Sequence, residues 1–128
     1  MKKELIFNTN LHFEHENWNR ELNFWEDELA SFQNRLEELA VRWTDKSVLA
    51  QVELFQNQFL LEKEAINSIQ DQIEMHETNM AGHYEKNEDV LNKDLVEKHL
   101  KLRERMENER ELFTDMKNKL FRFLTKYM

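Results

Sequence analysis

The sequence predicts an all-α protein: an antiparallel up-down-up three-helix bundle or coiled coil of long helices, folded as a single domain over residues 1–128. Three observations support this fold class. The chain has one glycine and no proline, so it lacks the turn residues that sheets need. Charged residues of both signs make up 34% of it, which suits the solvent faces of helices. Apolar residues recur at alternating intervals of four and three, the seam of a helix packed against other helices.

The first helix is predicted over about residues 9–44, where this seam is unbroken. Its seam positions are Leu11, His15, Trp18, Leu22, Trp25, Leu29, Phe32, Leu36, Leu39 and Trp43. His15 stands where a leucine is expected. Residues 44–47 supply a short connection and helix-capping side chains, and so short a loop requires the next helix to be antiparallel.

The second helix is predicted over about 46–82 and the third over about 88–127. The second seam is Val48, Val52, Phe55, Phe59, Glu62, Ile66, Ile69, Ile73, His76, Met80 and His83. The third is Asn92, Leu95, His99, Leu102, Met106, Glu109, Phe113, Met116, Leu120, Phe123 and Tyr127. Gly82 is expected to end the second helix, because glycine adopts the left-handed cap without steric cost.

Further apolar residues lie beside the seams and widen the apolar stripe. They are Leu54, Leu60, Leu61, Val96, Leu100, Leu112, Phe121 and Leu124. One interpretation is a broad surface facing the bundle interior. The other is an additional interface, with a second copy or another helical protein completing a larger bundle. We favour the second interpretation, in the form of a homodimer.

Charge and composition exclude several classes of partner. The net charge of −8 disfavours nucleic acid and anionic lipid, which both reward clustered lysine and arginine. Cysteine is absent, so disulfides, thiolate nucleophiles and cysteine-based zinc sites are excluded. No apolar run approaches the roughly 20 residues of a membrane span, and the opening residues are too polar for a signal peptide. We therefore expect a cytoplasmic protein without nucleic-acid or membrane partners.

All five histidines are predicted to lie at one end of the bundle. Antiparallel packing pairs residues of the first two helices whose numbers sum to about 91, which places His15 and His76 in one layer. The second turn places His99 one layer further inward, about 5 Å along the axis. His83 falls two layers outward, and His12 lies one helical turn from His15.

Clustered histidines at this position predict a transition-metal site. Neutral imidazole is a common ligand for zinc, copper and iron, and a bundle core brings ligands from facing helices to one point. We predict His15, His76 and His99 as ligands, with His12 and His83 as auxiliaries, for zinc, copper, iron or manganese. Nearby apolar residues are expected to keep the site dry on one side.

Carboxylates are expected close to this cluster, where they could orient the imidazoles or bind the ion. Glu16 follows His15, Glu77 follows His76, and Glu88 lies near His83. Two alternatives remain open. The histidines could be ordinary polar core residues of a coiled-coil interaction or scaffold protein, or they could form a pH-sensitive end that opens on protonation near pH 6.

No motif indicates a specific enzyme. The H-E-x-x-H pattern fails at Asn19 and Met80, and no acid stands three residues before any histidine, as the Glu-x-x-His pair of di-iron bundles requires. Helix count and ligand spacing also differ from those of haemerythrin-like and ferritin-like bundles. A three-helix bundle without a loop lid argues against a deep substrate pocket. We therefore favour binding over catalysis and leave an enzymatic activity open.

Two acids, Glu62 and Glu109, take seam positions in one layer opposite Leu29. Carboxylates facing each other in a core raise one pKa and can share a proton or hold a cation. The favoured interpretation is that they reach water, or pair with Lys63, Arg105 or Arg110, and fix the register of the helices.

Overall fold

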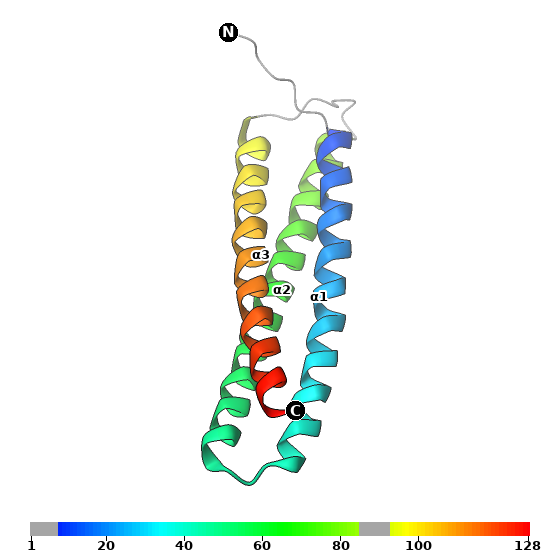
Figure 1. Cartoon of the computed structure of the whole chain (residues 1–128). Helices are drawn as coiled ribbons and strands as arrows, with labels where there is room; N and C mark the ends of the chain where they lie inside the picture. Colours follow the sequence, from blue (N-terminus) through cyan, green and yellow to red (C-terminus); the bar gives the residue numbers. More distant parts are fainter. Residues whose placement is uncertain (1–7, 85–92) are drawn as a thin grey trace.

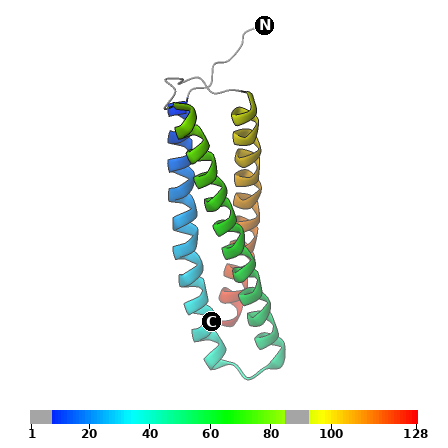
Figure 2. The same cartoon turned by 180° about the vertical axis from the view of Figure 1, so that it is seen from behind.

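The computed structural model describes residues 8–84 and 93–128, with side chains described over 10–82 and 93–128. It contains three helices, α1 (Asn8–Arg42), α2 (Lys46–Tyr84) and α3 (Lys93–Tyr127), and no strand in the described ranges. Helix α2 runs antiparallel to α1, and α3 returns parallel to α1 (Figures 1 and 2). The predicted all-α, up-down-up three-helix bundle is confirmed.

The connection between α1 and α2 is capped by Asp45. Its carboxylate accepts hydrogen bonds from the backbone N–H groups of Ser47 at 2.7 Å and Val48 at 3.4 Å, so it satisfies amides that have no partner within the helix. Helix α1 ends at Arg42, two residues before the expected end. Trp43 instead directs its indole N–H to the backbone oxygen of Tyr127 at 2.9 Å, which ties this turn to the end of α3.

The end of α2 differs from the sequence prediction. The helix continues through Gly82 to Tyr84, so Gly82 does not act as its left-handed cap. A Cβ atom at this position would contact nothing within 4 Å, which shows that glycine is not required by packing. The expected start of the third helix at residue 88 lies outside the described residues, and α3 is described from Lys93.

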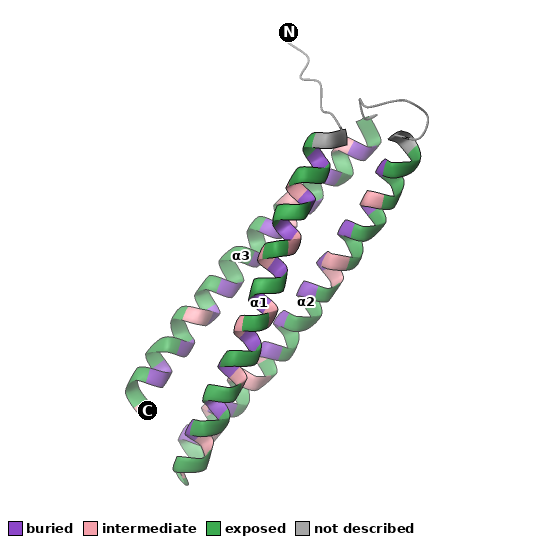
Figure 3. Ribbon diagram, turned by 90° about the vertical axis from the view of Figure 1, so that its right-hand side faces the viewer, coloured by how far each residue is buried: buried purple, intermediate pink, exposed green. Residues whose placement is uncertain are grey.

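The core follows the predicted seams (Figure 3). Every seam position with a described side chain is buried, except Trp43, Phe55 and Tyr127, which are half-buried. The buried apolar residues form one large cluster along most of the bundle and a small one at the histidine end. Burial of these side chains supplies the main driving force for closing the three helices.

Helices α1 and α3 are held in register by three ion pairs along their shared edge. Glu14 pairs with Arg103, Glu21 with Arg110, and Glu28 with Lys117. The two members of each pair are 89 residues apart, and successive pairs are seven residues apart on both helices. The same difference in residue number therefore relates the ion-pair partners of α1 and α3 along this edge, as expected for parallel helices with a heptad pattern.

The apolar residues beside the seams have two different environments. Leu124 is buried in the large cluster, and Val96 packs against the small one. The other six are exposed: Leu54, Leu60, Leu61, Leu100, Leu112 and Phe121. The broad bundle-facing surface therefore accounts for only two of the eight apolar residues beside the seams.

None of the described helices is apolar enough over a sufficient length to cross a lipid bilayer.

Candidate metal centre

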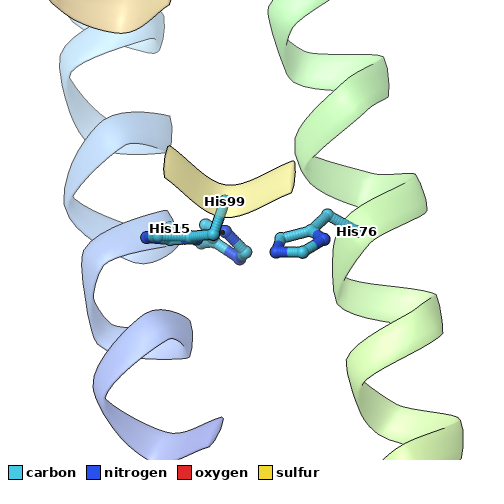
Figure 4. A group of neighbouring side chains, drawn as sticks. All are labelled: His15, His76 and His99. Atoms are coloured by element: carbon cyan, nitrogen blue, oxygen red, sulfur yellow. Dashed lines mark hydrogen bonds between the residues drawn. The ribbon is translucent and has the colours of Figure 1, made fainter. Parts of the chain in front are cut away.

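Three buried histidines, one from each helix, meet inside the bundle (Figure 4). His15, His76 and His99, hereafter the histidine triad, are 1%, 5% and 1% exposed. Their ring centroids are 4.8 to 5.5 Å apart. One ring nitrogen from each lies within 4.8 Å of the other two. This group of donor atoms could hold a metal ion.

The three rings lie at one level of the bundle (Figure 4), so the prediction that His99 lies a layer inward is wrong for its ring. The centroid separations of His99 from His15 and from His76 are similar, at 4.8 and 5.5 Å. The reason is the tilt of helical side chains toward the N-terminus of their helix. The side chain of His99 extends from its backbone along the bundle axis, and this brings its ring level with those of His15 and His76 (Figure 4).

Apolar residues cover the triad on both sides along the bundle axis. On each helix the triad histidine stands between a seam residue of the small cluster and a seam residue of the large one. The outer residues are Leu11, Met80 and Leu95, and the inner ones are Trp18, Ile73 and Leu102. The Trp18 ring stacks on His99 with centroids 5.0 Å apart. The site is therefore dry on two sides, whereas the sequence predicted one.

Glu77 binds two histidines of α1 from the edge between α1 and α2. Its carboxylate accepts a hydrogen bond from Nδ1 of His15 at 2.5 Å and another from Nδ1 of His12 at 2.8 Å. Burial opposes ionisation of Glu77, but these two bonds prevail and its pKa is lowered. The expected carboxylate near the cluster is thus present on α2.

His12 lies outside the triad. It is more than half exposed, and its Nε2 is 2.8 Å from Glu16 while its Nδ1 faces Glu77. The hydrogen bond to Glu77 is the main cause of its raised pKa. The structure therefore places His12 and Glu16 at the rim of the site. The side chain of His83, and Glu88, lie outside the described residues.

Glu14 is a site residue that the sequence did not reveal. Its carboxylate accepts a hydrogen bond from Nε2 of His99 and two from Arg103, at 3.1 and 2.9 Å. Burial would raise the pKa of Glu14, but the bonds from His99 and Arg103 lower it overall. The signal in the sequence is the seven-residue spacing of acids on α1 and bases on α3.

Of the three buried histidines, His76 differs in its hydrogen bonding. Neither Nδ1 nor Nε2 has a hydrogen-bond partner among the described residues. Burial lowers its pKa to about 4, and the neighbouring His15 contributes in the same direction. Leaving a buried polar atom without a partner costs about 1–3 kcal/mol. The ring is therefore a neutral imidazole whose lone pair is available to a ligand.

Burial also lowers the pKa values of His15 and His99, against the opposing effect of their hydrogen bonds to carboxylates. All three imidazoles are then neutral at pH 7, which is the form that binds metals. The alternative of a pH-sensitive end stays a prediction, and its most readily protonated member is His12, whose pKa is raised by Glu77.

The Glu62 and Glu109 layer is a separate polar feature. Both residues are 7% exposed, and one carboxylate oxygen of each has no hydrogen-bond partner among the described residues. Burial, then a hydrogen bond and the charge of Glu109, raise the pKa of Glu62 to about 8. Arg110 pairs with Glu21 instead. The expectation that these acids reach water or pair with a base is wrong, and at pH 7 the pair retains one proton.

Comparison with protein-family models, curated proteins and solved structures gave no match. The fold and the site therefore define the class of protein on their own: a three-helix bundle that encloses a three-histidine centre. Any function has to be argued from the geometry of that centre.

Proposed function

We propose that the protein binds a divalent transition-metal ion through the histidine triad. The observation that carries this proposal is the approach of two ring nitrogens, Nε2 of His15 and Nδ1 of His99, to 3.0 Å in a buried layer. His76 supplies the third nitrogen from α2.

The two carboxylates determine which nitrogens face each other with lone pairs. The Glu77 carboxylate accepts a hydrogen bond from the Nδ1–H of His15, and the Glu14 carboxylate accepts one from the Nε2–H of His99. In a neutral imidazole the other nitrogen then carries a lone pair. Both facing nitrogens are acceptors in this state and cannot hydrogen-bond each other. A cation between them removes this conflict, and carboxylates on the outer nitrogens are the usual way of orienting metal-bound histidines.

Distances and charge also fit an ion. Zinc–nitrogen bonds of about 2.0–2.1 Å place two ligands of a tetrahedral ion about 3.3 Å apart, close to the 3.0 Å between His15 and His99. His76 must move inward, since the donor atoms span up to 4.8 Å. The two carboxylates offset the charge of a divalent ion, so burial of the ion does not leave a net charge of two.

The donor set favours zinc or copper as the first metals to test. Imidazole nitrogen suits zinc, copper, iron and nickel, and the chain has no cysteine that could add a thiolate. Three imidazoles leave the fourth position of a tetrahedral zinc ion to a small non-protein ligand. Iron and manganese remain in the test set.

The test is metal content and affinity of protein prepared without an affinity tag. We expect about one equivalent of metal by elemental analysis, or one zinc site by calorimetry after chelation. His76→Leu removes one ligand without introducing a polar group, and it should abolish stoichiometric uptake with the helical circular dichroism retained. His12→Gln is the matched control and should bind normally. Absence of uptake by the unaltered protein for zinc, copper, iron and manganese would refute the proposal.

A second candidate function rests on the exposed apolar residues of α2. Leu54 and Leu61 are 68% and 65% exposed and seven residues apart, so they lie on one helix face. We propose that this face packs against a second copy of the chain. Sedimentation at increasing protein concentration should show a dimer that Leu61→Lys abolishes, whereas Lys63→Gln, nearby on α2, should leave it intact.

A further inference from the structure

The three edges of the bundle at the level of the triad are not alike. The α1–α2 edge is closed by Glu77, which contacts His12 and His15. The α1–α3 edge is closed by Glu14, which contacts His99 and Arg103. Both of these edges carry a carboxylate.

The α2–α3 edge instead carries a groove of about 440 Å³, hereafter the α2/α3 groove. It is lined by Gln72, Met75, His76, Asn79, Lys98, Lys101, Leu102 and Arg105. His76 is the member of the triad that lines it. Apolar clusters cover the triad along the axis, whereas His76 forms part of the wall of this groove.

The charge of the groove is opposite to that of the protein. Its lining contains three cations, Lys98, Lys101 and Arg105, and no acid, although the net charge of the chain is −8. Lys98 lies 3.8 Å from the exposed Asp94. Among the described residues, Lys101 and Arg105 have no ion-pair partner. Asp71 and Glu74 line a neighbouring depression that shares Met75 and Asn79 with the groove.

We propose that the α2/α3 groove admits a small oxyanion, a carboxylate or a phosphate, to the fourth coordination position of the metal. This inference rests on the proposed metal site. An anionic oxygen is a suitable ligand for a divalent ion held by three neutral imidazoles. Lys101 and Arg105 bind the outer oxygens of the anion, and Met75 and Leu102 contact the carbon atoms of a carboxylate.

Cobalt(II) gives the experiment a direct optical signal. It replaces zinc in such sites, and its visible absorption changes when the fourth ligand changes. The cobalt-loaded full chain is titrated with acetate and, separately, with inorganic phosphate at constant low ionic strength. We expect saturable spectral changes, and the two titrations distinguish a carboxylate from a phosphate as the preferred oxyanion.

The cations of the groove are tested by the double variant Lys101→Gln with Arg105→Gln. Cobalt uptake should stay as in the unaltered protein, while the half-saturating concentration of the preferred anion rises about tenfold, the effect expected from two partly exposed charges. The control is Lys119→Gln with Arg122→Gln, which makes the same changes at exposed positions farther along α3 and should leave anion binding unchanged.

The outcomes separate this inference from the proposed function. Cobalt uptake without a spectral response to either anion overturns the inference and leaves the metal site standing. A response that the double variant does not weaken overturns the role of the groove. Failure of the unaltered protein to take up cobalt, zinc, copper, iron and manganese overturns both.

Discussion

His15 and His99, separated by 84 residues in the sequence, present Nε2 and Nδ1 to each other at 3.0 Å in the core, and each has its other nitrogen bound to a glutamate. In the proposed metal site, these carboxylates leave the two facing nitrogens with their lone pairs toward each other. Trp43 and Tyr127, at the opposite end of the bundle, are also 84 residues apart and in contact. The register that joins α1 to α3 is therefore the same at both ends.

Zinc is expected to stabilise the fold. A ligand that binds only the folded state, at 100 times its dissociation constant, adds about 2.7 kcal/mol, which corresponds to a rise in Tm of roughly 10 °C for a chain of this size. Thermal melts by circular dichroism, with and without zinc, measure the effect. His99→Ala should lose the shift, and a full shift in that variant would contradict the site.

The carboxylates behind the ligands are expected to tune affinity. Glu14→Gln should weaken zinc binding by about 10- to 100-fold, because the amide no longer orients His99 and offsets less charge. Calorimetric titration checks this. Glu21→Gln is the control, since Glu21 pairs with Arg110 one heptad farther along the same edge. Equal affinity in both variants would show that Glu14 has no influence on the metal.

Removing His76 is expected to stabilise the metal-free protein. Its two unpartnered buried nitrogens cost free energy in the fold, so His76→Leu should raise the free energy of unfolding by about 1–2 kcal/mol while it abolishes zinc binding. Urea unfolding in the presence of a chelator gives the value. A large loss of stability would mean that His76 is mainly a structural residue.

The contribution of Glu62 to stability is expected to fall as the pH rises from about 4.5 to 8, because the pKa of Glu62 is about 8 in the fold against an ordinary value of 4.5. At this residue the folded state binds more protons than the unfolded state in that window, so raising the pH favours unfolding through Glu62, and its effect levels off above 8. The buried histidines, whose pKa values are lowered, act in the opposite direction at the acidic end, so the Glu62 effect is the difference between the unaltered protein and its Glu62 variant. Glu62→Gln should remove this slope and add about 2 kcal/mol at pH 8. Urea unfolding at several pH values tests it, with the exposed Glu64→Gln as a control that keeps the slope.

The sequence predicts the helices and their buried faces well because one periodicity determines both. Any residue on a 4-3 seam faces the other helices, and this placed His15, His76 and His99 inside. It also placed Glu62 and Glu109 inside. The seam pattern could not show that Glu62 and Glu109 lack basic partners among the described residues, because such pairing depends on which basic side chains can reach the core. Arg110, one of the expected partners, is bound by Glu21.

The contacts between α1 and α3 were harder to predict than those along the turns. Residues of two consecutive antiparallel helices can be paired because their numbers add to a constant across the turn that joins them. Helices α1 and α3 are not consecutive, so this rule does not pair their residues directly. Glu14 was missed for this reason, although its partner Arg103 belongs to a heptad-spaced series. The α2/α3 groove was missed because a groove depends on which side chains leave an edge uncovered, and the seam pattern specifies only the residues that close the core.

Each helix contributes one histidine to the triad. A hairpin of α1 and α2 contains two of the three histidines, so the proposed metal site is complete only when α3 has joined them. Uptake of the ion would therefore report the final step of assembly. Residues that never touch the metal, such as Lys117 and Glu28 along the α1–α3 edge, should alter its affinity in proportion to how firmly they hold the third helix in place.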